Sequence, residues 1–212
     1  IRIGGASVLF FIPLIRELVL LLNVRSVSRE SIVRSLKGGF SVALNPGGIY
    51  EMVHTSHEQE QIFVQNRLGF IRLAMEAGVP LLCMYSFGEN QVFHAHTFAL
   101  KQRRWVAKRL RVGIPLPTGR FGVPLLPLPT KVTLVVGNAV DVGPPNPAPS
   151  DAEVDAVFRA YVAEMGRIFK EHGRRFLPPD VAERGLRIER IGRGLVEHFH
   201  VGDQPSSVKA RA

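Results

Sequence analysis

Residues 41–51 read Ser-Val-Ala-Leu-Asn-Pro-Gly-Gly-Ile-Tyr-Glu, an apolar run that ends abruptly in a turn. The run from Ser41 to Leu44 predicts a short buried strand, and Asn45-Pro46-Gly47-Gly48 predicts the turn that ends it. Paired glycines let the backbone approach a ligand closely, and the carboxylate of Glu51 can accept hydrogen bonds from a hydroxyl. Taken alone, the same glycines also fit a turn that binds nothing.

Helix and strand patterns alternate on both sides of this strand. Ser28 is placed to cap a helix that runs to about Lys37. Ser150 and Glu153 have the spacing of a capping box, and apolar residues then recur at steps of three and four through Phe169. The other predicted elements are strands at 62–64, 79–84 and 132–136 and a helix over 68–77 that Gly78 ends. This order predicts an α/β fold with a mixed, largely parallel sheet, flanked by helices that cover both faces.

The composition describes one globular domain with a basic surface. The chain has 212 residues, with 27 Lys plus Arg against 18 Asp plus Glu, and a single Cys. One Cys excludes a disulfide framework and a Cys-rich metal site. A pI near 10.4 beside a mean hydropathy of +0.11 is unusual, because soluble basic proteins are normally polar. The combination favours an anionic lipid surface as partner over nucleic acid, for which the chain has no recognisable motif.

The two ends of the chain differ from its middle. Near the start, the apolar runs Val8–Ile12 and Leu18–Leu22 are each too short to span a bilayer, which needs about 20 apolar residues. A helix from Pro13 to about Leu22 fits burial in a core and shallow insertion into a membrane surface equally well. At the other end, residues 178–212 are basic and lack a strong period. They predict a weakly structured tail after a core of residues 1–177.

A second group of polar residues follows another predicted strand. Tyr85-Ser86-Phe87-Gly88-Glu89-Asn90 closes the apolar run of 79–84. Glu89 offers an acceptor, Asn90 an amide and Phe87 an apolar wall, although a turn capped by Asn carries equal weight. Arg29 and Arg67 are candidate contacts for an anion, while most arginines are only solvated surface.

Other familiar chemistries have little support in the sequence. His54 and His57 are spaced His-x-x-His and His94 and His96 are spaced His-x-His, but no third metal ligand is placed. A serine hydrolase would need a Gly-x-Ser-x-Gly elbow, which is missing. Cys83 sits within an apolar strand and is interpreted as a packing residue. We therefore predict no metal site and no bound cofactor.

Several short motifs occur in a fixed order along the chain. They are Phe11–Glu17, Val27–Glu30, Asn45–Gly48 with Glu51, Asn66–Phe70, Tyr85–Asn90, Gly119–Gly122, Val135–Gly137 and Phe169–His172. Together they strongly resemble the type-2 diacylglycerol acyltransferase family, which includes monoacylglycerol and wax-ester relatives. The resemblance covers about Ala6 to Gly173, and its most distinctive parts are the Gly-Gly-x-x-Glu and Ser-Phe-Gly-Glu-Asn elements.

The resemblance implies a glycerolipid acyltransferase-like fold and transfer of a fatty acyl group from acyl-coenzyme A, a co-substrate, to a hydroxyl of a glyceride. It implies the endoplasmic reticulum membrane or a lipid-droplet surface as the location, and it leaves a homo-oligomer open. The family's catalytic histidine lies in a His-Pro-His-Gly motif that this sequence does not contain. The expectation is an acyltransferase core without its N-terminal catalytic segment and membrane hairpin.

The resemblance also assigns supporting residues of a site. Glu51 is expected beside the catalytic base, where it orients the base or the acceptor hydroxyl. Arg29 and Arg67 are expected to contact the phosphates of coenzyme A. The residues expected to bind substrates are Arg29, Asn45, Gly47, Gly48, Arg67, Phe87, Glu89 and Asn90.

Two other interpretations stay open. A lysophosphatidate-type acyltransferase would show Glu-Gly-Thr-Arg where this chain has Gly-Gly-Ile-Tyr-Glu, a difference that favours the neutral-glyceride branch. A non-catalytic protein of lipid surfaces would use the first apolar segment and the basic region Lys101–Arg111, with Trp105 as its interfacial anchor. The missing histidine motif is positive support for this second alternative.

Overall fold

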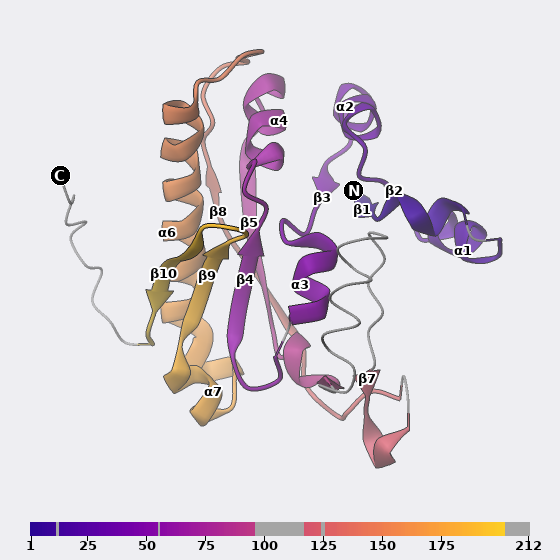
Figure 1. Ribbon diagram of the computed structural model, residues 1–212, viewed down its shortest axis with the longest axis vertical. Coiled ribbons are helices and arrows are strands. Elements are labelled where there is room, and N and C mark those ends of the chain that lie inside the picture. Colours follow the sequence, from indigo (N-terminus) through magenta and orange to yellow (C-terminus); the bar gives the residue numbers. More distant parts are fainter. Residues whose placement is uncertain (12, 55, 96–116, 124–125, 202–212) are drawn as a thin grey trace.

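The computed structural model describes residues 1–11, 13–54, 56–95, 117–123 and 126–201, so the basic region around Trp105 and His96 lie outside it (Figure 1). The first half of the chain forms β1 (Arg2–Gly5), η1 (Ser7–Phe11), α1 (Ile15–Leu21), β2 (Val24–Ser26), α2 (Arg29–Lys37), β3 (Val42–Ala43), α3 (Gly48–His54), β4 (Glu60–Val64), α4 (Gly69–Ala77), β5 (Leu81–Phe87), η2 (Glu89–Gln91) and β6 (His94–Ala95). The second half forms β7 (Pro117–Thr118), η3 (Arg120–Gly122), β8 (Thr133–Val140), α6 (Asp151–Phe176), α7 (Pro179–Arg184), β9 (Leu186–Arg190) and β10 (Gly194–Phe199).

The predicted α/β class is confirmed, with mixed strand directions. The sheet β2-β1-β3 is entirely parallel, and β4 pairs in parallel with β9. The remaining pairs, β9–β10, β5–β8 and β6–β7, are antiparallel. Among the described residues the strands form four small sheets rather than the one larger sheet that the alternating pattern predicts.

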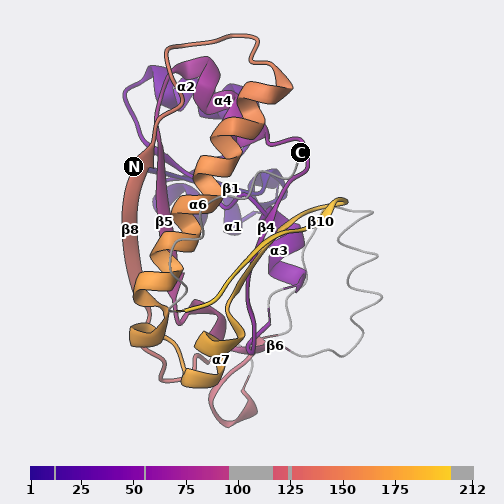
Figure 2. The same cartoon turned by 90° about the vertical axis from the view of Figure 1, so that its left-hand side faces the viewer.

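Helix α6 supplies a large part of the hydrophobic core and runs alongside β5 and β8 (Figures 1 and 2). The predicted capping box at its start is present: the backbone N–H of Glu153 donates to Ser150 Oγ, and the backbone N–H of Ser150 donates to the Glu153 carboxylate at 2.8 Å. One face of α6 packs on β5 and β8, with Ile168 and Phe169 fully buried. The helix thereby fixes the strand whose end carries the Ser-Phe-Gly-Glu-Asn motif.

The β5–β8 pair has one covered face and one exposed face. Cys83, Tyr85 and Phe87 point into the core against α6, while Leu82 is 55% exposed and Met84 is 41% exposed. The prediction that helices cover both faces of the strands is therefore wrong here. The run 79–84 is apolar on both sides of the strand, so it reads as fully buried although α6 covers one side only.

The prediction of a weakly structured tail is wrong for residues 179–199. Helix α7 and strands β9 and β10 occupy this range, and Leu186 and Ile188 of β9 are fully buried. Strand β9 runs parallel to β4, with Glu60 opposite Leu186 and Val64 opposite Arg190. The buried pair alternates with Arg187 and Glu189 in a strand of only five residues, so its period is hidden among the charged neighbours.

The first apolar segment lies apart from the core. The predicted helix is present as α1, none of its residues is buried, and Figure 1 shows it extending away from α6. Leu14 and Leu21 are 84% and 83% exposed, so the core-burial alternative is wrong. Among the described residues, every helix is too short or too polar to cross a bilayer.

Candidate active site

The Gly-Gly turn joins β3 to α3 and is tied to the end of β4. The Gly47 N–H donates to Asn45 Oδ1 at 3.1 Å. Gln65, directly after β4, donates from its backbone to Pro46 O at 3.3 Å and from Nε2 to Gly47 O at 3.2 Å. Gly48 has φ +56°, which glycine adopts without strain. The predicted turn is confirmed, and a short helix follows it that the sequence analysis did not predict.

Glu51 lies in α3 with its carboxyl folded back over this turn. A Cβ atom on Gly47 would collide with Glu51 Oε2 and would fall 2.6 Å from Phe63 O, so only glycine leaves room for the carboxyl. The carboxyl accepts hydrogen bonds from the backbone of Phe63 and Gly47 and from the Asn45 side chain. Burial raises the pKa of Glu51 to about 7, the nearby Glu89 carboxylate adds to the rise, and the hydrogen bonds oppose it.

A second buried carboxylate, Glu60, lies at the start of β4. Its side chain is almost completely buried, and three donors converge on it. Oε2 accepts from the Tyr85 hydroxyl and from Asn90 Nδ2 at 3.0 Å, and Oε1 accepts from Gln91 Nε2 at 3.0 Å. We call Glu60, Tyr85, Asn90 and Gln91 the Glu60 cluster. It ties the first residue of β4 to the turn that follows β5.

The sequence analysis missed Glu60. Its only local signal is a carboxylate at the start of the apolar run Ile62–Val64, where an unpaired charge would be costly to bury. A charged residue entering a buried strand therefore calls for partners, but the partners come from a different strand. Only the fold identifies them.

Three carboxylates lie within electrostatic range of Tyr85, and one of them, Glu60, accepts a hydrogen bond from it. Burial is the main cause that raises the pKa of the Tyr85 hydroxyl well above its usual range. The carboxylates of Glu60, Glu51 and Glu89 raise it further, in that order. In the chain, Glu51 follows β3, Glu60 begins β4 and Glu89 follows β5. The structure thus brings the end of the Gly-Gly turn and the end of the Ser-Phe-Gly-Glu-Asn motif into one region.

Two other predicted site residues have different surroundings. Phe87 is fully buried, and its ring lies 4.6 Å from that of Tyr85 and 5.7 Å from that of Phe176, centroid to centroid. It therefore belongs to the hydrophobic core behind the site. Asn90 is half-buried and joins the Glu60 cluster, while Glu89 beside it is exposed.

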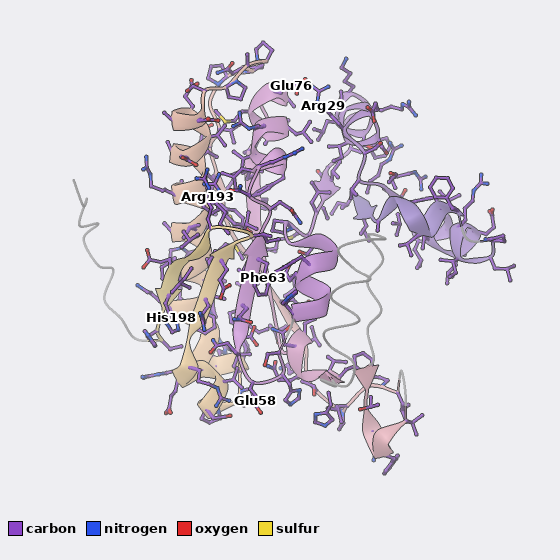
Figure 3. The ribbon with its side chains drawn as sticks, viewed as in Figure 1. Arg29, Glu58, Phe63, Glu76, Arg193 and His198 are labelled. Carbon is purple, nitrogen blue, oxygen red and sulfur yellow. The ribbon has the colours of Figure 1, made fainter. Side chains whose placement is uncertain are left out.

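The two predicted anion contacts lie in different places. Arg29, at the start of α2, has Nη2 2.7 Å from both carboxylate oxygens of Glu76 on α4, and Figure 3 shows this pair far along the molecule from Glu58. Arg67 is exposed in the turn between β4 and α4. It lies two residues after Gln65, which holds the Gly-Gly turn. Of the two arginines, Arg67 is therefore closer in the chain than Arg29 to the segment that holds the Gly-Gly turn.

The cysteine and the histidines that the structure describes have ordinary structural contacts. His54 bonds through Nδ1 to Tyr50 O at 2.8 Å, and the rings of His57 and His94 are 4.8 Å apart. Within the part of the chain that the structure describes, no three His, Cys, Asp or Glu residues are grouped to hold a metal ion. Burial, with a smaller effect of Glu164, raises the pKa of the Cys83 thiol to about 12, so it is unsuited to act as a nucleophile.

This α/β protein has glycine turns after β3 and β5, and the buried carboxyl groups of Glu51 and Glu60 lie beside strand ends. The sequence profile of the diacylglycerol acyltransferase family matches residues 2–183, and the chain belongs to this family.

The chain is similar to several curated members of the family. It is 30% identical over 183 residues to Diacylglycerol O-acyltransferase 2-like protein 6 of Mus musculus, covering 77% of this chain and 53% of that protein. It is 29% identical to Diacylglycerol O-acyltransferase 1 of Schizosaccharomyces pombe, covering 82% of this chain and 53% of that protein. It is 30% identical to 2-acylglycerol O-acyltransferase 3 of Homo sapiens, covering 77% and 52%. The chain thus spans about half the length of these relatives. No solved structure matches it.

Proposed function

We propose that this protein is an acyl-CoA-dependent O-acyltransferase of neutral glycerolipids, which acylates diacylglycerol or monoacylglycerol. The names of its relatives as diacylglycerol and 2-acylglycerol acyltransferases support the substrate class. The single observation that carries the proposal is the position of Glu51, whose carboxyl lies over the Gly-Gly turn and within electrostatic range of Glu89.

The reaction sets clear requirements for the site. The acceptor hydroxyl oxygen attacks the thioester carbonyl carbon, so a C–O bond forms and the C–S bond breaks. The hydroxyl proton passes to a general base and then to the departing thiolate, which gives an ester and free coenzyme A. A base within hydrogen-bond reach is needed because an unactivated alcohol is a poor nucleophile.

Glu51 suits a supporting role in this reaction. Its ionised carboxyl accepts a hydrogen bond from the base or from the acceptor hydroxyl and so orients it. With a pKa of about 7, the group is half ionised at neutral pH. We assign no histidine of this chain the role of base.

The substrates have separate proposed contacts. Arg67 is exposed, two residues after the Gln65 that bonds to the Gly-Gly turn, and is proposed to pair with a phosphate of acyl-coenzyme A. Arg29 can do the same only by sharing its guanidinium with Glu76. The glyceride is proposed to arrive from the endoplasmic reticulum membrane or a lipid-droplet surface.

A second candidate function rests on α1. Its exposed apolar side chains, with Leu14 before them, would also suit a non-catalytic protein that binds lipid surfaces. This protein would bind liposomes and transfer no acyl group.

One experiment separates these functions. The protein expressed from its complete gene is incubated with labelled oleoyl-coenzyme A and liposomes that contain diacylglycerol, monoacylglycerol or lysophosphatidate. We expect ester formation on the neutral acceptors, and at least a 100-fold loss of turnover in Glu51→Ala with the fold retained. Transfer to lysophosphatidate alone identifies the other acyltransferase class, and liposome binding without any transfer identifies the lipid-surface protein.

A further inference from the structure

The Glu60 cluster fixes the orientation of two side-chain amides. Gln91 Nε2 donates to Glu60 Oε1 at 3.0 Å and to His57 O at 3.1 Å, so its NH₂ group has two acceptors on one side. Gln91 Oε1 is buried and has no hydrogen-bond partner among the described residues. The reverse orientation would place this oxygen against two acceptor oxygens. The Gln91 amide therefore has one tolerable orientation.

Glu60 also orients Asn90. Its Oε2 atom accepts a hydrogen bond from Asn90 Nδ2 at 3.0 Å, so the Asn90 NH₂ group is turned toward Glu60. Glu60, Tyr85 and Gln91 are buried, whereas Asn90 is half-buried. The amide oxygen of Asn90 consequently points away from the buried cluster. The residue before it, Glu89, is close enough to raise the pKa of Glu51.

The turn itself is held in place independently. Gly88 has φ +85°, and a Cβ atom there would collide with Lys131 O. The Thr130 hydroxyl donates to Gln91 O at 3.1 Å. Because the backbone is fixed from this side, we expect a change at position 60 to alter the orientation of the Asn90 amide and not the path of the turn.

We propose that Glu60 is a positioning residue that fixes the Asn90 amide with its carbonyl oxygen outward, as a hydrogen-bond acceptor that holds the acyl-acceptor hydroxyl on binding, before this hydroxyl turns its proton to the general base. This inference rests on the proposed acyl transfer and adds a residue to its site. Asn90 makes the contact with the substrate, and Glu60 acts through Asn90.

The substitution Glu60→Gln tests this orientation because it changes one oxygen into an NH₂ group. If the new NH₂ group at position 60 faced Gln91, it would meet the Gln91 NH₂ group, which is also a donor and which His57 O holds in this orientation. It must therefore face Tyr85 and Asn90. The Tyr85 hydroxyl can rotate to accept, but Asn90 can accept only by reversing its amide, which turns its NH₂ group outward.

The variants are made in the protein expressed from its complete gene. We expect Glu60→Gln to lower kcat about 10- to 100-fold, with KM for oleoyl-coenzyme A within threefold of wild type. The matched control is Glu58→Gln, an exposed glutamate two residues earlier, which is expected to keep wild-type kcat (Figure 3). In the double variant Glu60→Gln/Asn90→Asp, the carboxylate at position 90 offers one oxygen to the NH₂ group at position 60 and a second oxygen outward. Its kcat should be at least tenfold higher than that of Glu60→Gln.

A second readout does not depend on catalysis. In ¹⁵N-labelled protein, the Asn90 NH₂ group is expected to exchange with solvent at least tenfold faster in Glu60→Gln than in wild type or Glu58→Gln. Failure of the double variant to recover kcat, or equal exchange rates in all proteins, overturns the inference. If wild type transfers no acyl group, the proposed function fails, and the exchange rates alone decide whether Glu60 orients Asn90.

Discussion

Gly47 lies directly against the carboxyl of Glu51, with no space between them for a methyl group. A side chain at position 47 would also meet Phe63 O near the end of β4. The absence of a side chain here therefore lets the turn, α3 and β4 pack closely against one another. The requirement for glycine here comes from close approach, because Gly47 is not among the residues with positive φ.

Gly47→Ala is expected to displace Glu51 and the turn. The added Cβ meets backbone as well as side chain, so we expect at least a tenfold loss of turnover and a loss of about 1–3 kcal/mol in the free energy of unfolding. Steady-state acyl transfer and urea denaturation measure the two effects. Gly69→Ala is the control, because a Cβ at Gly69 meets nothing within 4 Å. Equal behaviour of the two variants would contradict the packing argument.

The raised pKa of Glu51 predicts a pH dependence of stability. Its pKa is about 7 in the folded protein against 4.5 for an ordinary Glu, so between these values the folded chain binds more protons than the unfolded chain. Stability from this group therefore falls as pH rises from about 4.5 to 7, by about 3 kcal/mol in all, and is constant above.

Glu51→Gln removes this dependence. Urea denaturation at pH 5 and pH 8 should show a smaller loss of stability on raising the pH than wild type does. Glu58→Gln, on the surface, should keep the wild-type difference. Superimposable pH profiles for wild type and Glu51→Gln would show that Glu51 does not titrate in this range.

Residues beyond 178 are predicted to be part of the cooperative fold. Leu186→Ala empties a fully buried position on β9 and should lower the free energy of unfolding by about 2–5 kcal/mol. Leu195→Ala on β10, where the side chain is 51% exposed, should cost less than about 1 kcal/mol. Chemical denaturation followed by circular dichroism compares them. A loss of less than about 1 kcal/mol in the free energy of unfolding of Leu186→Ala would instead indicate that residues beyond 178 are loosely attached.

Arg67→Ala is expected to raise KM for acyl-coenzyme A about fivefold with little change in kcat. An exposed charge contact is worth about 1 kcal/mol, and the rise should shrink as salt screens the phosphate. Arg174→Ala, which removes an exposed arginine from the last turn of α6, is the control for net charge. An unchanged KM in Arg67→Ala removes this residue from the proposed binding site.

Local signals in the sequence predict much of the fold. The Ser28 cap, with Ser31 N–H donating to Ser28 Oγ at 3.3 Å, and the left-handed Gly78 at the end of α4 are both where their residue types indicate. The strands β3, β4 and β8 coincide with predicted apolar runs. These features depend on neighbours in the chain, which is why the sequence alone shows them.

The Glu60 cluster and β9 could not be predicted in this way. Glu60 finds its partners on β5 and in the turn that follows it, and β9 is recognised as a strand only when it is paired with β4. A carboxylate at the start of a short apolar run and a five-residue alternation of apolar and charged residues are each ambiguous in isolation. Their structural roles arise from contacts between segments that are distant in the chain.

The pairing of β4 with β9 also sets an order of events on the ribosome. Residues 60–64 leave the ribosome well before residues 186–190, which come roughly 120 residues later. At 5–20 residues per second the wait is about 6 to 24 seconds. During this time Ile62, Phe63 and Val64 have no parallel neighbour from β9, and the nascent chain carries an unpaired apolar edge that chaperones can hold.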